Sequence, residues 1–319
     1  MKYSPKLKNR SLLSINDLDD SEMMEIIELA IALKKRRSDG IRGNLLHRKN
    51  IALIFEKGST RTRCSATIAA RDEGGDVEYL TRADTHFGVK ESVKDTARVL
   101  GRIFDGILFR GFSQETLRQL DLHSGVPVWN GLTDNFHPTQ ILADLMTMKE
   151  AFGTIKGKKV VYIGDGRNNV ANSLMAGCAK AGVDFVNCTP EKLFPEKEMV
   201  QRAMAIADKN NSTVRITSNP DDAVVGANVI YTDVWFSMGE ETRKAERVSL
   251  LKPFQVNMEL MEKTGNIEGE LIFLHCLPAF HDNNTEASHD TGALEVTNDV
   301  FEAPFSKVFD EAENRMHTI

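Results

Sequence analysis

From residue 51 onward, the chain of 319 residues alternates short apolar runs with longer amphipathic stretches. Continuous apolar runs are typical of strands buried on both faces of a parallel sheet, and apolar positions recurring every three or four residues are typical of helices. The predicted strands are 51–55, 77–80, 107–109, 127–129, 159–163, 185–188, 214–217, 229–232 and 271–274. The predicted helices between them are 62–73, 93–103, 114–122, 139–152, 172–181, 197–209, 221–225 and 240–250. This β-α-β-α order predicts parallel sheets with helices on both faces.

The alternation of strands and helices occurs in two successive sets, which indicates an α/β protein with two doubly wound parallel-sheet domains. A length of 319 residues agrees with two domains at about 150 residues each. We expect the first domain over residues 1–138, with segment 305–319 packing back on it, and the second over 139–304. Because ligands of open parallel sheets bind at the carboxyl ends of the strands, we expect the active site in the crevice between the domains.

Composition excludes several classes of protein. Lys and Arg number 40 against 46 Asp and Glu, and a net charge of −6 argues against a protein that binds nucleic-acid tracts. No apolar run approaches the ~20 residues that span a bilayer, and no apolar stretch follows the basic N-terminus as in a secretory signal. The four cysteines form no C-x-x-C pair, so we expect neither a disulfide framework nor a zinc site. These features predict a cytoplasmic protein.

The sharpest motif is Ser59-Thr60-Arg61-Thr62-Arg63, which follows Gly58 between a predicted strand and a predicted helix. A helix N-terminus offers free N–H groups and a partial positive charge to an anion. Hydroxyls add donors, and an arginine binds phosphate through two parallel hydrogen bonds. The spacing is not that of a Walker loop. We therefore expect a phosphate-type anion here, the alternative being an ordinary capped helix with solvated arginines.

Three further side chains follow strands of the first set. Arg110 comes directly after a strand and is placed to reach the same anion, or else to form a salt bridge. His137 precedes a predicted helix, with Gln140 one turn later. A neutral imidazole there could polarise a carbonyl oxygen, and the alternative is a histidine that caps the helix.

The segment Gly164-Asp165-Gly166 only partly matches a dinucleotide fingerprint. The third glycine of G-x-G-x-x-G is replaced by Asn169, and the next predicted strand ends without a carboxylate before Glu191. We therefore reject a dinucleotide cofactor. Asn168 and Asn169 remain polar donors at the sheet edge.

Two later segments carry candidate chemistry. Asp233 could bind an ammonium group, and Ser237-Met238-Gly239 resembles a hinged loop, the alternative being a solvated turn. Cys276 has four readings: a small buried hydrophobe, a zinc ligand, a nucleophile or a polar contact to a bound amine. His275 would be a poor base for Cys276 if adjacent residues of a strand point apart.

Together these motifs resemble the aspartate/ornithine carbamoyltransferase superfamily over nearly the whole chain. The matching segments are FEKGSTRTRCS (55–65), KESVKDTARVLGR (90–102), VWNGLTDNFHPTQILAD (128–144), GDGRNN (164–169), YTDVWFSMGE (231–240), FLHCLPAFH (273–281) and AENRMHTI (312–319). The resemblance implies carbamoyl transfer from carbamoyl phosphate to the amine of L-ornithine, giving L-citrulline and phosphate in arginine biosynthesis or the arginine deiminase route. It implies a homotrimer, with no metal and no organic cofactor.

The resemblance also implies roles for individual residues. Arg61, Arg110, His137 and Cys276 would be catalytic. Carbamoyl phosphate would be bound by Ser59, Thr60, Arg61, Thr62, His86, Arg110, His137, Gln140, Cys276, Leu277 and Arg315. Ornithine would be bound by Asn169, Asp233, Ser237 and Met238. His86 stands where many bacterial relatives carry a glutamine that reaches the neighbouring subunit's active site.

Three alternatives remain at this point. The first is carbamoyl transfer to another amine, such as putrescine or an acylated ornithine, which the Asp233 and Ser237-Met238-Gly239 motif opposes. The second is a non-catalytic binding relative, which the presence of Arg61, Arg110 and His137 opposes. The third is a dehydrogenase, which the incomplete glycine fingerprint opposes.

Overall fold

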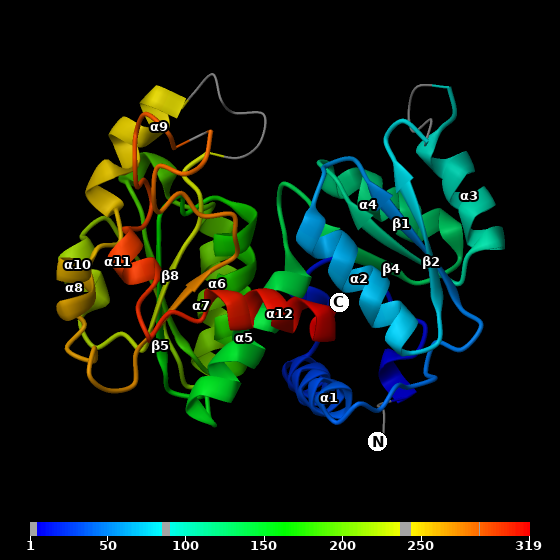
Figure 1. Cartoon of the computed structure of the whole chain (residues 1–319), viewed down its shortest axis with the longest axis horizontal. Helices are drawn as coiled ribbons and strands as arrows, with labels where there is room; N and C mark the ends of the chain where they lie inside the picture. The colour runs from blue at the N-terminus through cyan, green and yellow to red at the C-terminus, as the bar shows by residue number, and fades with distance from the viewer. Residues whose placement is uncertain (1–4, 85–89, 237–243, 287) are drawn as a thin grey trace. The chain divides into compact units, whose positions relative to one another are not determined.

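The structure is a computed structural model that describes residues 5–84, 90–236, 244–286 and 288–319. The chain forms two compact units (Figure 1). Unit 1 comprises Met1–Met146 and Glu313–Ile319, and unit 2 comprises Thr147–Ala312. The divisions lie within helix α5 (Pro138–Phe152) and helix α12 (Val308–Thr318), so the last turns of the chain belong to unit 1.

Unit 1 is built on a four-stranded parallel sheet in the order β2-β1-β3-β4. Its strands are β1 (Asn50–Phe55), β2 (Asp76–Thr81), β3 (Gly106–Arg110) and β4 (Val128–Leu132). Its helices before α5 are α1 (Asp20–Ser38), α2 (Thr60–Asp72), α3 (Val93–Ile103) and α4 (Gln114–Ser124).

Alternating residues of β1 supply two apolar cores in unit 1. Ala52 and Ile54 pack in a cluster with α3 and α4, which contributes Leu117 and Leu120. The odd-numbered residues of β1 face the opposite cluster, which contains Ala66 of α2 and, at its edge, the C-terminal Ile319. The sheet is therefore covered on both faces, which explains why its strands read as continuous apolar runs.

Unit 2 repeats the architecture with five parallel strands in the order β7-β6-β5-β8-β9. Its strands are β5 (Lys159–Ile163), β6 (Asp184–Cys188), β7 (Val214–Thr217), β8 (Val229–Thr232) and β9 (Ile272–His275). Its helices are α6 (Asn169–Ala181), α7 (Lys197–Lys209), α8 (Pro220–Val224), α9 (Lys244–Leu251), α10 (Met258–Glu262) and α11 (Asn298–Phe301).

The predicted fold class, two parallel-sheet α/β domains, is confirmed. The element boundaries differ mainly at helix starts. Helix α6 begins at Asn169 rather than 172, because the Asn168 side chain accepts a hydrogen bond from the Ala171 N–H and caps the helix. Of the helix expected at 240–250, residues 240–243 lie outside the described residues, and α9 is described from Lys244.

In each sheet, the order in which successive strands are added reverses beside the first strand of the unit. In unit 1, β2 lies on one side of β1 and β3 on the other; in unit 2, β6 and β8 flank β5. The loops that follow the two inner strands of such a switch point diverge, leaving room for a ligand at the carboxyl ends. This places the loop after β1 beside Arg110, and the loop after β5 beside Asp233.

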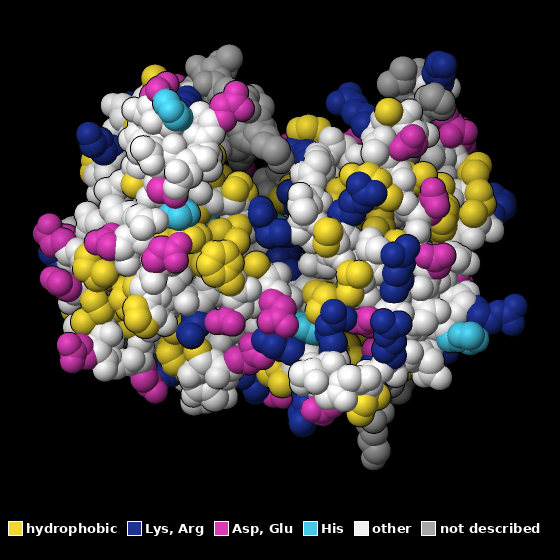
Figure 2. All heavy atoms as spheres, viewed as in Figure 1, with side chains coloured by type: hydrophobic (Ala, Val, Ile, Leu, Met, Phe, Trp, Pro, Cys, Tyr) yellow, Lys and Arg dark blue, Asp and Glu magenta, His cyan; other side chains and the backbone are white. Residues whose placement is uncertain are grey.

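The surface of unit 1 is locally basic, although the chain as a whole is acidic. Lys and Arg side chains lie over α2 and toward α1 in Figure 2, and α1 carries Lys35, Arg36 and Arg37 in its last turn. A cavity of about 730 Å³ elsewhere in this unit is lined mainly by apolar residues of α1, α2, β1 and the end of α12, with charged side chains such as Arg36, Arg37 and Asp72, and by none of the predicted site residues. No helix within the described ranges is long and apolar enough to cross a membrane.

Candidate active site

The loop after β1 leads directly into helix α2. Ser59 is the N-cap residue, with its hydroxyl accepting a hydrogen bond from the Thr62 N–H at 3.2 Å. The same hydroxyl donates to Thr62 Oγ1 at 3.1 Å. Thr60 is exposed and Arg61 is half-buried in the first turn. The N–H groups and hydroxyls of this turn form the donor-rich helix N-terminus that the motif predicted.

Two arginines far apart in the sequence converge on Thr62. Arg110, the last residue of β3, donates to Thr62 Oγ1 from Nη1 at 3.3 Å. Arg315, on α12, donates to the same oxygen from Nη2 at 2.8 Å. All three residues are buried within unit 1. The turn therefore carries concentrated positive charge, which suits a phosphate.

His137 lies beside these arginines and is buried. Burial lowers the pKa of its imidazole well below the usual value, and the positive charges of Arg315, Arg110 and Arg61 lower this pKa further. The ring is therefore neutral at pH 7 and able to donate to a carbonyl oxygen without adding charge. The backbone carbonyl of His137 accepts from the N–H groups of Gln140 and Ile141. The main chain therefore starts helix α5, and the imidazole is not required for this.

Gln140 is fully buried in the first turn of α5, where its Nε2 donates to Asp144 Oδ1 at 2.8 Å. This contact fixes the orientation of the Gln140 amide. The predicted residue His86 lies outside the described residues.

In unit 2, Asn168 and Asp233 join the loops after β5 and β8. Asn168 Nδ2 donates to Asp233 Oδ2 at 3.0 Å and to the hydroxyl of Tyr162 at 2.7 Å. The carboxylate of Asp233 is buried, and burial raises its pKa; hydrogen bonds from Cys276 and the Val234 N–H act in the opposite direction. A buried carboxylate held by donors in this way is a suitable partner for an ammonium group.

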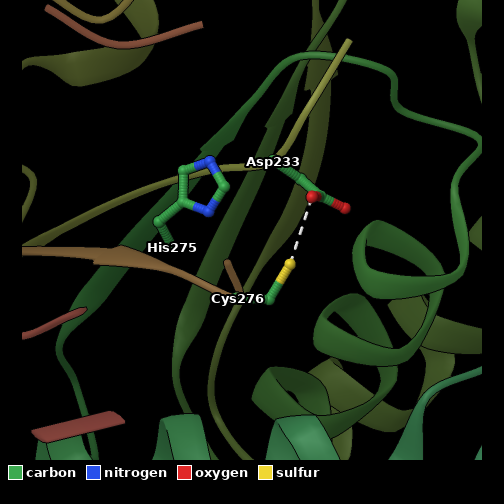
Figure 3. A group of neighbouring side chains, drawn as sticks. All are labelled: Asp233, His275 and Cys276. Atoms are coloured by element: carbon green, nitrogen blue, oxygen red, sulfur yellow. Dashed lines mark hydrogen bonds between the residues drawn. The ribbon is translucent and has the colours of Figure 1, made fainter. Parts of the chain in front are cut away.

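Cys276 and His275 complete this group from the end of β9. The Cys276 thiol donates to Asp233 Oδ1 at 3.1 Å, drawn as the dashed line in Figure 3. One ligand atom from each of Asp233, His275 and Cys276 lies within 4.8 Å of the others. The expected divergence of His275 and Cys276 is therefore wrong: β9 ends at His275, so strand alternation does not govern the pair.

His275 has both ring nitrogens in contact with protein groups. Nδ1 accepts a hydrogen bond from the Leu277 N–H at 2.9 Å, and Nε2 lies 3.2 Å from Glu295 Oε1. These contacts assign the Nε2–H tautomer. Asp233, His275 and Cys276 are chemically able to hold a metal ion, but a metal on Nδ1 would have to displace the Leu277 N–H. The contact instead holds Leu277 in a left-handed backbone conformation, with φ at 54°.

The partial glycine motif has a packing role. Gly166 donates its N–H to Thr189 Oγ1 at 3.0 Å, and a Cβ at position 166 would lie 2.6 Å from the methyl carbon of Thr189. Asn187 Nδ2 donates to the Gly166 carbonyl at 3.0 Å. Glycine is thus required here because the loop packs closely against the end of β6.

Of the other site residues predicted in unit 2, the structure describes two and leaves two undescribed. Asn169 is the half-buried first residue of α6, and Leu277 follows Cys276. Ser237 and Met238 lie outside the described residues. Sequence patterns assigned no role to two groups that touch these residues: the Tyr162 hydroxyl and the Glu295 carboxylate. Tyr162 lies in the predicted strand 159–163, where a polar atom inside an apolar run was the one available signal, and Glu295 lies in a segment for which no element was predicted.

Comparisons with known proteins identify the family. The carbamoyl-P binding domain of aspartate/ornithine carbamoyltransferase matches residues 10–150, and its Asp/Orn binding domain matches residues 156–319. The catabolic ornithine carbamoyltransferase of Bacillus licheniformis is 55% identical over 100% of this chain and 96% of its own length. That of Enterococcus faecalis is 51% identical, covering 98% of this chain and 94% of its own.

Solved structures agree with these sequence matches. The ornithine carbamoyltransferase of Pyrococcus furiosus has a TM-score of 0.90 and 42% identity, over 98% of this chain and 95% of that one. The ornithine carbamoyltransferase of Gloeobacter violaceus has a TM-score of 0.82 and 39% identity, over 100% and 96%. The resemblance carried by the motifs is confirmed: the chain belongs to the aspartate/ornithine carbamoyltransferase family.

Proposed function

We propose that this chain transfers the carbamoyl group of carbamoyl phosphate to the δ-amine of L-ornithine, giving L-citrulline and phosphate. The observation that carries the proposal is the convergence of Arg110 and Arg315 on Thr62 beside a neutral His137. This group contains donors for both a phosphate and a carbonyl oxygen. The names of the full-length relatives support ornithine as the acceptor.

In this proposal, unit 1 binds carbamoyl phosphate. The α2 N-terminus, with Ser59, Thr60 and Arg61, holds the phosphate. His137, Arg110 and Thr62 donate to the carbamoyl oxygen as it becomes an oxyanion, and each such donor typically contributes about 3–4 kcal/mol. Gln140, Arg315 and His86 complete the carbamoyl-phosphate contacts from unit 1, and Leu277 of unit 2 adds one more.

Unit 2 supplies the amino-acid site. Asp233 and Cys276 contact the amines of ornithine, and Asn169 holds the α-carboxylate, with Ser237 and Met238 completing the contacts. An alkyl amine has a pKa of about 10.4 in solution, so it loses a proton before its lone pair can attack.

The chemistry requires no metal and no organic cofactor, because carbamoyl phosphate is already an activated acyl donor. The ammonium group first gives one proton to solvent. The neutral δ-nitrogen then forms a bond to the carbamoyl carbon, and the bond from that carbon to the phosphate oxygen breaks. The departing phosphate accepts the second proton, which the nitrogen gives up once the new bond has formed. The arginines around Thr62 stabilise the charge that accumulates on the phosphate.

The same proposal extends to assembly and cellular context. We infer a homotrimer from the family resemblance of the whole chain, and a cytoplasmic location from the composition. The word catabolic in the names of several relatives favours the degradative direction, in which citrulline is consumed.

The test supplies carbamoyl phosphate labelled with ¹³C at its carbonyl carbon and follows product by NMR while phosphate is measured. We expect label in citrulline and one phosphate released for each citrulline formed. Binding of carbamoyl phosphate without turnover would indicate a non-catalytic relative. The Arg61→Ala variant is expected to lose product, and Arg63→Ala, two positions further along at an exposed site, serves as its control.

A further inference from the structure

Arg247 on helix α9 is a buried arginine that none of the motifs includes. It is 9% exposed, and its carboxylate partner Asp165 is 6% exposed. Arg247 Nη2 donates to Asp165 Oδ2, and Arg247 Nε donates to the backbone carbonyl of Trp235 at 3.0 Å. One guanidinium therefore binds two different loops: Asp165 follows β5, and Trp235 follows β8.

Those two loops carry the amino-acid half of the proposed site. The Asp165 carbonyl accepts from the Asn168 N–H at 3.2 Å, and the side chain of Asn168 in turn donates to Asp233 at 3.0 Å. Asp233 lies two residues before Trp235. The loops are thus joined twice, by Asn168 and Asp233 at one place and by Arg247 at another.

Apolar packing around Arg247 fixes the position of helix α9, and the shape of the guanidinium suits its two acceptors. Trp235 and Leu251 are buried in one apolar cluster, against which Val248 packs, so α9 is fixed next to the segment that Arg247 binds. Arginine is suited to this position because its planar fork offers separate donors in fixed directions, whereas the ammonium group of lysine is a single point charge. The exposed pair Arg215 and Asp222, also in unit 2, is a useful contrast: the side chains are 44% and 57% exposed, and Arg215 donates to a carboxylate and a carbonyl of the same residue.

We propose that Arg247 is a positioning residue for the amino-acid substrate: by holding Asp165 and the Trp235 carbonyl together, it sets Asn168 and Asp233 in place to receive the amine. The inference rests on the proposed role of Asp233 in binding ornithine. Arg247 itself does not touch the reacting atoms.

The test compares Arg247→Met with wild type by measuring both Michaelis constants. Displacement of a site by about 1 Å can cost about 100-fold, so we expect KM for ornithine to rise by about 10- to 100-fold. The KM for carbamoyl phosphate should stay within about twofold, because that ligand binds unit 1. Arg247→Lys should recover part of the affinity, and Arg215→Met, the exposed control, should leave both constants within about twofold.

Three results separate the explanations. Equal changes in both constants, or a loss that follows only the folded fraction measured by thermal unfolding, would overturn the positioning role. Should Arg247→Met fail to fold, Asp165→Ala removes the acceptor and with it the same contact from the other side, and an unchanged ornithine KM in that variant would also overturn it. A wild-type enzyme that makes no citrulline would instead refute the proposed function.

In that last case, Arg247 is tested without turnover. Trp235 is one of two tryptophans, so its fluorescence can be isolated in a Trp129→Phe background. A shift of Trp235 emission in Arg247→Met but not in Arg215→Met supports the positioning of this loop. Identical emission in all three proteins overturns it.

Discussion

Arg315 Nη2 donates a hydrogen bond to Thr62 Oγ1 at 2.8 Å, although 253 residues separate the two in sequence. The contact brings the C-terminal helix to the N-terminus of α2, within unit 1. Lys34 of α1 adds a second attachment by donating to Asn314 Oδ1 at 2.8 Å. Helix α12 is thereby attached to the turn that we propose binds the phosphate.

Replacing Arg315 should weaken the use of carbamoyl phosphate. A hydrogen bond to a charged group is worth about 1.5–3 kcal/mol, so we expect Arg315→Ala to lower kcat/KM for carbamoyl phosphate by about 10- to 100-fold. Steady-state rates at saturating ornithine measure the effect. Arg118→Ala, whose side chain is 63% exposed, is the control. A change of less than about twofold in Arg315→Ala would remove Arg315 from the site.

Because of His137, the free energy of unfolding should fall as the solution becomes acidic. Its folded pKa lies below its unfolded value, so the unfolded chain binds a proton that the folded chain does not. This contribution to stability is fully present above the unfolded pKa, near 6.5, and is lost as the pH falls toward the folded pKa. The limiting slope is about 1.4 kcal/mol per pH unit.

The His137→Gln variant should lose this slope. We expect its free energy of unfolding to fall less steeply than that of wild type between about pH 6.5 and pH 5, as measured by urea denaturation. His289→Gln, at a side chain 79% exposed, provides the comparison. Parallel curves for wild type and His137→Gln would mean that the imidazole is not held neutral.

Asp233→Asn should affect one substrate only. Removing one partner of a buried charge pair costs about 2–5 kcal/mol, so kcat/KM for ornithine should fall by at least about 30-fold. The Kd of carbamoyl phosphate, measured by calorimetry, should remain within about twofold of wild type. Asp221→Asn replaces an exposed carboxylate of unit 2 and should change neither quantity. Weaker binding of carbamoyl phosphate in Asp233→Asn would contradict the assignment of this residue to the amino acid.

Cys276→Ser distinguishes a polar contact from a nucleophile. The thiol donates to Asp233, and a serine hydroxyl can do the same, so we expect kcat to fall by less than about tenfold. Mass spectrometry of wild type quenched during turnover should detect no protein carrying an additional carbamoyl group. A covalent adduct at Cys276, together with inactive Cys276→Ser, would establish the nucleophile reading instead.

Local sequence patterns predicted the fold well because most strands are buried on both faces and therefore read as apolar runs. Helix starts were predicted less well: helices expected from 62 and 172 begin at Thr60 and Asn169, because Ser59 and Asn168 cap them. The switch points depend on the order of strands in each sheet, which local sequence patterns do not reveal. That order is what places Arg110 next to Thr62 and Asp233 next to Asn168.

Contacts between segments far apart in the chain could not be predicted from local sequence patterns. Arg315 entered the site only through the family resemblance, and Arg247 was not singled out, because an arginine on a short amphipathic helix is normally solvated. Glu295 was missed for a related reason: it lies 20 residues after His275, and only the folded loops bring the two together. The roles of His86, Ser237 and Met238 stay predictions.

Selection of ornithine by unit 2 is best measured by competition in one reaction. Equal concentrations of ornithine, putrescine and aspartate are mixed with limiting carbamoyl phosphate, and the carbamoylated products are quantified, so that their ratio equals the ratio of kcat/KM values. We predict that citrulline exceeds each other product by at least about 100-fold. Carbamoylputrescine or carbamoylaspartate as the main product would contradict the account.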